Sequence, residues 1–178
     1  GRTAIVGIGC TEFARRLGRT EEDTAFEAIG AALADAGLEP RDVDGVFQVE
    51  GQSGEPWDVA RRLGVDNLRA WSTTGGGGGA AGAPVVWAAA AVASGMAEVA
   101  VAYRARNRGS MQRPWAGSPA RPVDNRAFSL PYGLVAPAQQ IALTARRYLH
   151  ESGAPAECFA RVAVAQRAHA VRNPRAVF

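Results

Sequence analysis

An apolar segment that follows a run of glycines constrains the fold more than any other part of the sequence. Residues 84–93 read PVVWAAAAVA, with no charged side chain and with Gly95 just beyond them. A helix that is apolar nearly all round is buried on all sides, and a run this short does not span a bilayer. Pro84 is tolerated only in the first helical turn, so the regular helix should begin between residues 79 and 83. We therefore expect a layered protein in which this helix is buried between two sheets.

Segments typical of strands and helices alternate through the first part of the chain. The helix that begins at residue 21 is the best marked, because Thr20 and Asp23 resemble a capping box and Gly37 supplies a stop. The expected order is strand 3–10, helix 21–36, strand 45–51, helix 56–63, strand 67–74, the apolar helix and strand 97–105, which should be fully buried. This order predicts an α/β layered fold with a mixed, mostly parallel sheet.

The regular pattern stops after residue 105. Residues 106–134 contain four prolines and several arginines, and long ordered loops of this kind are more often functional than not. Apolar positions at helical spacing then predict helices over 138–149 and 159–173. We expect two parts: an α/β unit over 1–105, and a loop region with helices that return to the core over 106–178.

Composition excludes several classes of protein. The chain has 178 residues, 47% of them apolar and 21% charged, which is typical of a globular protein. Its basic residues are all arginine and are spread along the chain, whereas a nucleic-acid partner requires a clustered basic face. Cys10 and Cys158 belong to no metal-binding pattern, and we expect both to be small buried hydrophobic residues. No signal peptide or membrane span is evident, so we expect a cytoplasmic protein.

The glycine run itself, 75–79, allows several interpretations. Residues 77–82 match the G-x-G-x-x-G dinucleotide pattern between a strand and a helix. However, any run of five glycines matches it by chance, and Tyr103 and Arg104 stand where an acidic residue would bind the ribose. A flexible linker is a weak alternative, because linkers rarely join a buried strand to an apolar helix. The glycines then serve either tight packing with positive φ or an active-site loop whose N–H groups face a ligand.

The sequence resembles the N-terminal half of the thiolase superfamily. The matching pieces are 3–10, the helix end 88–95 and the segment 96–103; across the last two, SGMAEVAVA at 94–102 fits the family pattern. Further on, LPYGLVAPAQQIALTARRYLHESG and AVAQRAHAVRNPRAVF resemble the sterol-carrier and lipid-transfer branch, so the resemblance covers essentially the whole chain. It implies a second half that repeats the α/β unit, and we expect that half to be missing after Phe178.

One departure from the family pattern decides the chemistry that the resemblance implies. Thiolases carry a nucleophilic cysteine in this loop, and counting back from Glu98 places it at Gly78. No Cys, Ser or Thr occurs between Gly75 and Pro84, so an acyl-enzyme cannot form there. A related branch, common in steroid-degrading actinobacteria, resembles steroid side-chain aldolases, which cleave a β-hydroxyacyl-CoA by a retro-aldol step. That step needs a base and a stabilised enolate, but no covalent adduct.

The resemblance implies the following site and partners. Gly77, Gly78, Gly79 and Tyr132 are the predicted substrate-binding residues, although an aromatic that packs in a turn is the favoured interpretation of Tyr132 taken by itself. The catalytic groups are expected mostly in the missing half. Coenzyme A is part of the substrate, and no separate cofactor or metal is expected. The expected products are a ketosteroid and propionyl-CoA. The predicted partners are a second copy, paired through 68–74, and a small OB-fold, zinc-ribbon protein that binds acyl-CoA.

Two other functions stay open. One is a non-catalytic subunit that binds acyl-CoA or lipid, and the other is a true thiolase with its nucleophile elsewhere. Among the polar residues, Arg104, Arg106 and Arg108 either meet the phosphates of CoA or lie in solvent or a subunit interface. His150 and His169 lie near the C-terminal ends of the last two predicted helices, where a cation suits the helix dipole.

Overall fold

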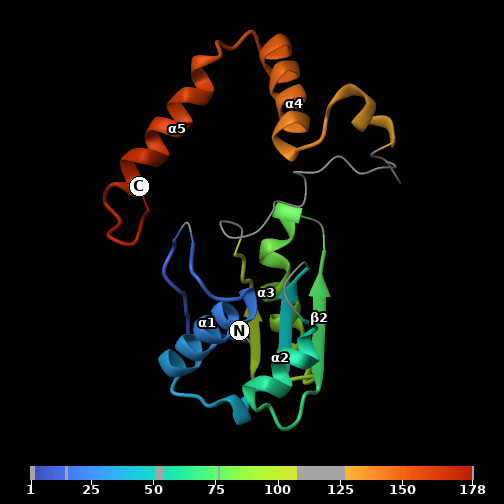
Figure 1. Ribbon diagram of the computed structural model, residues 1–178, viewed down its shortest axis with the longest axis vertical. Coiled ribbons are helices and arrows are strands. Elements are labelled where there is room, and N and C mark those ends of the chain that lie inside the picture. The colour runs from blue at the N-terminus through green and yellow to red at the C-terminus, as the bar shows by residue number, and fades with distance from the viewer. Residues whose placement is uncertain (1–2, 15, 51–53, 76, 108–126, 178) are drawn as a thin grey trace. The chain divides into compact units, whose positions relative to one another are not determined.

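The computed structural model describes residues 3–14, 16–50, 54–75, 77–107 and 127–177 (Figure 1). The chain divides into two compact units, Gly1–Ser110 and Met111–Phe178. The first unit contains the sheet and the glycine run, and the second contains the last two α-helices.

The first unit is built on a three-stranded parallel sheet with the order β2-β1-β3. The strands are β1 (Gly45–Val49), β2 (Ala70–Thr74) and β3 (Ala100–Tyr103). All five residues of β1 are buried, as befits a central strand. The prediction of parallel strands in these three places is confirmed, although β3 is only partly buried and not fully buried as expected.

Helices α1 (Glu21–Ala36) and α2 (Pro56–Leu63) cover one face of this sheet. Both have the predicted bounds, and the predicted capping box is present, because the Asp23 N–H donates to Thr20 Oγ1 over 3.0 Å. Gly37 ends α1 in the left-handed region at φ 69°, which a residue with a Cβ rarely adopts. The core on this side is formed by Ala25, Ile29, Leu33, Val43, Val46, Val59, Ala60, Tyr103 and Ala105.

Helix α3 (Ala83–Ser94) packs on the other face of the sheet. There Ala88 and Ala91 form a core cluster with Phe47 and Ala70. It begins at Ala83, within the predicted range. The prediction that it is buried on all sides is wrong for the described residues, because Val85, Val86 and Trp87 are exposed. The described part of the chain supplies one sheet, which covers one side of this helix, and the small alanines face it.

A carboxylate joins the beginnings of the three strands. Asp44 accepts hydrogen bonds from the Glu98 and Val99 N–H groups, at 2.9 Å each, and from Arg69 Nη1 at 3.1 Å. Arg69 Nη2 in turn donates to the Gly95 carbonyl over 2.9 Å, at the end of α3. This Asp44–Arg69 clamp fixes the amino ends of the sheet.

Residues 3–10 are not the predicted buried strand. The segment lies along α1, where the Ile8 N–H donates to Asp35 Oδ2 over 2.9 Å. A Cβ at Gly7 or Gly9 would collide with backbone carbonyls of α1, so glycine permits this close approach. The β-branched composition predicted a strand, but a strand forms only where a neighbouring strand pairs with its backbone groups, and this segment has none in the described residues.

The cysteines also differ from expectation. Cys10 is exposed and Cys158 is half-buried, so neither is the fully buried hydrophobic residue that we expected. Cys10 is the last residue of the segment that lies on α1, which is mostly exposed. Both thiols are free.

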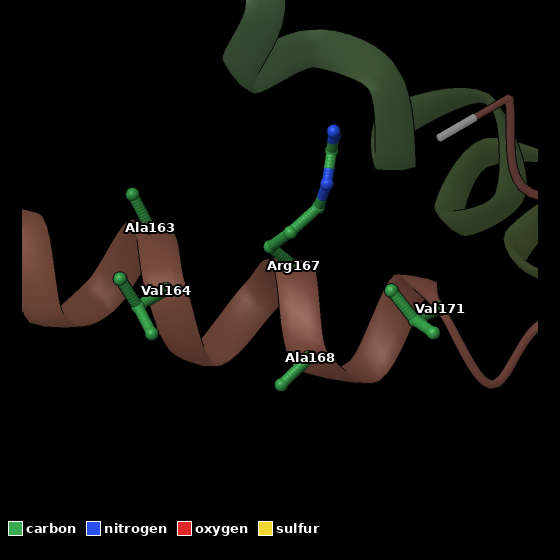
Figure 2. Close-up of a pocket in the computed structure, with 5 residues that line it drawn as sticks. All are labelled: Ala163, Val164, Arg167, Ala168 and Val171. Atoms are coloured by element: carbon green, nitrogen blue, oxygen red, sulfur yellow. The ribbon is translucent and has the colours of Figure 1, made fainter.

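The second unit contains η4 (Leu130–Tyr132), α4 (Pro137–Ser152) and α5 (Glu157–Ala170). The two predicted helices are confirmed, and the rings of Tyr148 and Phe159 pack between them with their centres 5.9 Å apart. A shallow, open pocket on α5 is lined by Ala163, Val164, Arg167, Ala168 and Val171, whose side chains Figure 2 shows. Most of the proline-rich insertion, 108–126, lies outside the described residues.

Candidate functional site

The glycine run leaves the sheet at the carboxyl ends of its parallel strands. In open α/β sheets, ligands bind outside this edge. Thr74 is the last residue of β2, and residues Gly77–Gly82 form the 3₁₀ helix η2, which leads directly into α3. The predicted residues Gly77, Gly78 and Gly79 therefore form the first turn of this helical segment.

The backbone of this segment can serve an anionic ligand. Gly82 has φ −86° and ψ −15°, so η2 continues into α3 with right-handed helical geometry. The first N–H groups of a helical segment have no acceptor inside it, and they carry the positive end of the helix dipole. Groups of this kind stabilise the oxygen of a developing enolate or oxyanion.

Gly75 lies against the carboxylate of Glu50. A Cβ at this position would lie 2.6 Å from Glu50 Oε2, whereas one at Gly82 would have no atom within 4 Å. Neither residue has a positive φ. A side chain at residue 75 would therefore require the Glu50 carboxylate, the end of a flexible and exposed side chain, to move.

A hydrogen-bond network around one buried side chain, which sequence reasoning missed, lies at this edge and reaches the exposed residue Thr73. Gln48 is 2% exposed, and its Nε2 donates to Thr73 Oγ1 over 3.1 Å and to the Gly54 carbonyl over 3.2 Å. Its Oε1 accepts a hydrogen bond from the Tyr103 hydroxyl. Burial, with a smaller contribution from the charge of Glu22, raises the pKa of Tyr103, so the phenol stays neutral and donates. The one signal in the sequence was a glutamine inside an apolar strand segment.

The segment that follows β3 is fixed at the same edge. Arg106 Nη2 donates to the Glu50 carbonyl, and the Glu50 N–H donates to the Thr74 carbonyl over 2.7 Å. Asn107 is buried, and its N–H donates to Glu21 Oε1 over 2.9 Å, at the start of α1. Arg106 thus holds the end of β1. Arg104 is exposed, and Arg108 lies outside the described residues.

Tyr132 belongs to the second unit, in η4, and is 81% exposed. Its role in substrate binding stays a prediction. His150 and His169 lie in the last turns of α4 and α5, as predicted, and both are exposed.

The described residues contain neither a metal-binding cluster nor a membrane-spanning helix. No group of three His, Cys, Asp or Glu side chains comes together there in a way that could hold a metal ion. None of the described helices combines the length and the apolar character that crossing a membrane requires.

The sequence is similar to two curated enzymes. No family model matches the chain. It is 50% identical over 184 residues to a steroid side-chain-cleaving aldolase of Thermomonospora curvata, a match over 100% of this chain and 47% of the relative. It is 48% identical over 185 residues to a 17-hydroxy-3-oxo-4-pregnene-20-carboxyl-CoA lyase of Mycobacterium tuberculosis, over 100% of this chain and 48% of that one. The chain thus spans about half the length of the curated relatives that it matches.

The fold of this chain is similar to parts of two solved structures. A structure described as an Ltp2-ChsH2(DUF35) aldolase matches 98% of this chain and 45% of its own, with a TM-score of 0.87 and 49% identity. A monomeric SCP2-thiolase-like protein of Mycobacterium smegmatis matches 58% of this chain and 23% of its own, with a TM-score of 0.50 and 28% identity. The chain therefore has a thiolase-like α/β fold, shared over almost its whole length with part of a solved aldolase.

Proposed function

We propose that this chain is part of a carbon–carbon lyase that cleaves the side chain of a steroid β-hydroxyacyl-CoA. The products are a ketosteroid and a short acyl-CoA, propionyl-CoA. The observation that carries this proposal is the 50% identity, over the whole chain, to a steroid side-chain-cleaving aldolase. The alternatives of a non-catalytic binding subunit and of a thiolase become outcomes of the test below.

The glycine run suits this reaction. In a retro-aldol step a base takes the proton of the β-hydroxyl, which becomes a ketone as the adjacent carbon–carbon bond breaks. The electrons of that bond pass to the thioester, whose enolate is then protonated to give the short acyl-CoA. The N–H groups of η2 are suited to bind the thioester oxygen, where the negative charge develops. Residues 75–82 hold no Cys, Ser or Thr, so the reaction proceeds without an acyl-enzyme at this loop.

We place the base and the proton donor in the part of the longer relatives that this chain does not span. Glycines at the floor of the site leave space for a branched, ring-bearing acyl group. A cysteine side chain at this place would narrow that space. Coenzyme A enters and leaves as part of the thioester, so the proposal requires no separate cofactor.

The free edge of β2 supports a homodimer. β2 is an edge strand without a charged residue, and Trp71 on it is 50% exposed. Uncharged edges of this kind are suited to pairing, and two copies of β2 would join here in antiparallel register.

The second proposed partner is a small protein that binds acyl-CoA through an OB-fold and a zinc ribbon. The solved aldolase that this chain resembles is described as an Ltp2-ChsH2(DUF35) aldolase, a description that joins two names, one of them marked DUF35. We propose that the protein containing this chain assembles with a component of the same kind.

The test is a product assay with the protein at its natural full length, together with its partner. The substrate is the CoA thioester in the name of the Mycobacterium tuberculosis relative. The expected result is equal amounts of ketosteroid and propionyl-CoA. Binding of the thioester without either product would favour the non-catalytic subunit, and loss of activity after alkylation of Cys10 or Cys158 would favour a thiolase.

A further inference from the structure

Gln48 is a polar side chain in a buried, otherwise apolar strand. Its neighbours in β1 include Val46, Phe47 and Val49, and all are buried. Burying a primary amide costs free energy unless its donors and acceptor are paired. An apolar residue would fill this position without that requirement, so the amide calls for a reason beyond packing.

The amide of Gln48 is paired on three sides by three different elements. Tyr103 of β3 donates to its carbonyl oxygen, and its Nε2 donates to Thr73 of β2 and to the Gly54 carbonyl. Both amide hydrogens and one lone pair are therefore used. Since the Gly54 carbonyl can only accept, it fixes which way the amide is turned, with the amide oxygen toward the Tyr103 hydroxyl.

Of these partners of Gln48, Thr73 is the one closest to the glycine run in the sequence. It is the second-last residue of β2, and Gly75 follows two positions later. The strand end is also held by the Glu50 N–H, which donates to the Thr74 carbonyl over 2.7 Å. A side-chain bond from Gln48 of β1 and a main-chain bond from Glu50, the residue after β1, thus hold consecutive residues just before the run begins.

We propose that Gln48 is a positioning residue of the lyase: through Thr73 it fixes the end of β2 and thereby sets the place of the η2 N–H groups. This inference rests on the proposed function for its catalytic consequence. Its structural content, the coupling of Thr73 to η2, does not depend on that function. The two are therefore tested with separate measurements.

The test compares two variants that each remove one partner of the same amide. Thr73→Val removes the acceptor on the side of the glycine run, and Tyr103→Phe removes the donor on the opposite side. Thr73→Ser keeps the hydroxyl and serves as the conservative rescue. Each variant is made in the full-length protein with its partner, so that no truncated chain has to fold alone.

The first measurement is amide hydrogen exchange of residues 80–82, which follow the first, unbonded N–H groups of η2. We expect Thr73→Val to accelerate this exchange about fivefold, since a local opening loses one hydrogen bond. Tyr103→Phe should accelerate exchange mainly in β3, and Thr73→Ser should leave the rate of residues 80–82 within about twofold of the parent. Unchanged exchange of residues 80–82 in Thr73→Val would overturn the inference, whether or not the protein is a lyase.

The second measurement is steady-state kinetics of the lyase reaction. We expect Thr73→Val to lower kcat about tenfold with KM within about twofold, since misplaced donors impair the transition state more than binding. Thr73→Ser should restore kcat. If Thr73→Val and Tyr103→Phe lower kcat equally for equal losses of Tm, Gln48 is merely structural and the inference fails. If the parent protein forms no products, the proposed function fails, and the exchange result still decides the coupling.

Discussion

The two ends of the parallel sheet are held by different chemistry. At the amino ends, the charged Asp44–Arg69 clamp joins β1, β2, β3 and the end of α3. At the carboxyl ends, a neutral network around Gln48 ties the strands, and the glycine run begins there. The contacts that stabilise the fold and the proposed site of chemistry therefore lie at opposite edges of one small sheet. Substitutions at the two ends should therefore have different signatures.

The largest effect is expected at the clamp. Asp44→Ala leaves the Glu98 and Val99 N–H groups and the Arg69 guanidinium without their acceptor, and should lower the free energy of unfolding by about 3 kcal/mol. Urea unfolding of the full-length protein measures this loss. Asp44→Asn, which keeps one carbonyl acceptor, should lose less. Lyase activity per folded molecule should be unchanged, and a selective fall in kcat would break the separation between the two ends.

At Gly75, the first glycine of the run, we expect a substitution to lower activity and to change stability little. Gly75→Ala places a Cβ 2.6 Å from the present position of Glu50 Oε2, so the carboxylate must move beside the glycine run. We expect kcat/KM to fall about tenfold, with Tm lowered by no more than a few degrees. The matched control is Gly30→Ala in α1, whose Cβ has no atom within 4 Å and which lies outside the proposed site. Equal losses of activity in the two variants would show that the carboxylate of Glu50 is irrelevant.

A smaller, purely structural effect is expected at the start of α1, beside the proposed site. Thr20→Ala removes the cap of the Asp23 N–H and should cost about 1 kcal/mol of stability, with kcat unchanged. Thermal unfolding and steady-state kinetics measure the two quantities. Thr20→Ser keeps the capping hydroxyl and should behave like the parent. A fall in kcat in Thr20→Ala alone would extend the functional edge to α1.

The smallest effect concerns pH. Hydrogen bonds from Thr20 lower the pKa of Asp23 below its ordinary value of 3.8. The ionised carboxylate therefore stabilises the fold above pH 3.8, and this contribution is lost as the pH falls through the lower pKa of the folded state. The stability difference between the parent and Asp23→Asn should shrink in that acidic range. A difference that stays constant down to the pKa of the folded state would contradict the capping role.

Local signals predicted the helices of the first unit well. Thr20, Asp23 and Gly37 mark the ends of α1, and Pro56 and Gly64 mark those of α2, because caps and stops act within a few residues. The place of the glycine run, between β2 and α3, also followed from the order of the segments. These features depend on neighbours in the sequence, and sequence patterns report them directly.

Features that depend on distant neighbours were missed. Residues 3–10 have the composition of a strand, but they lie on α1 without strand pairing in the described residues. The partners of Gln48 are separated from it by 25 residues at Thr73 and 55 at Tyr103, so no local pattern reveals the network. The approach of Glu50 to Gly75 is likewise a contact between strands, visible only once the sheet has formed.

The most direct test of the central proposal measures products and enzyme mass in one reaction. The full-length protein, with its partner, is mixed with the steroid CoA thioester, and the mixture is followed by quantitative mass spectrometry. We predict equal amounts of ketosteroid and propionyl-CoA, while the mass of the intact protein stays unchanged throughout turnover. An acyl adduct on the protein, or turnover without a ketosteroid, would contradict cleavage by a retro-aldol step at a glycine loop that has no nucleophile.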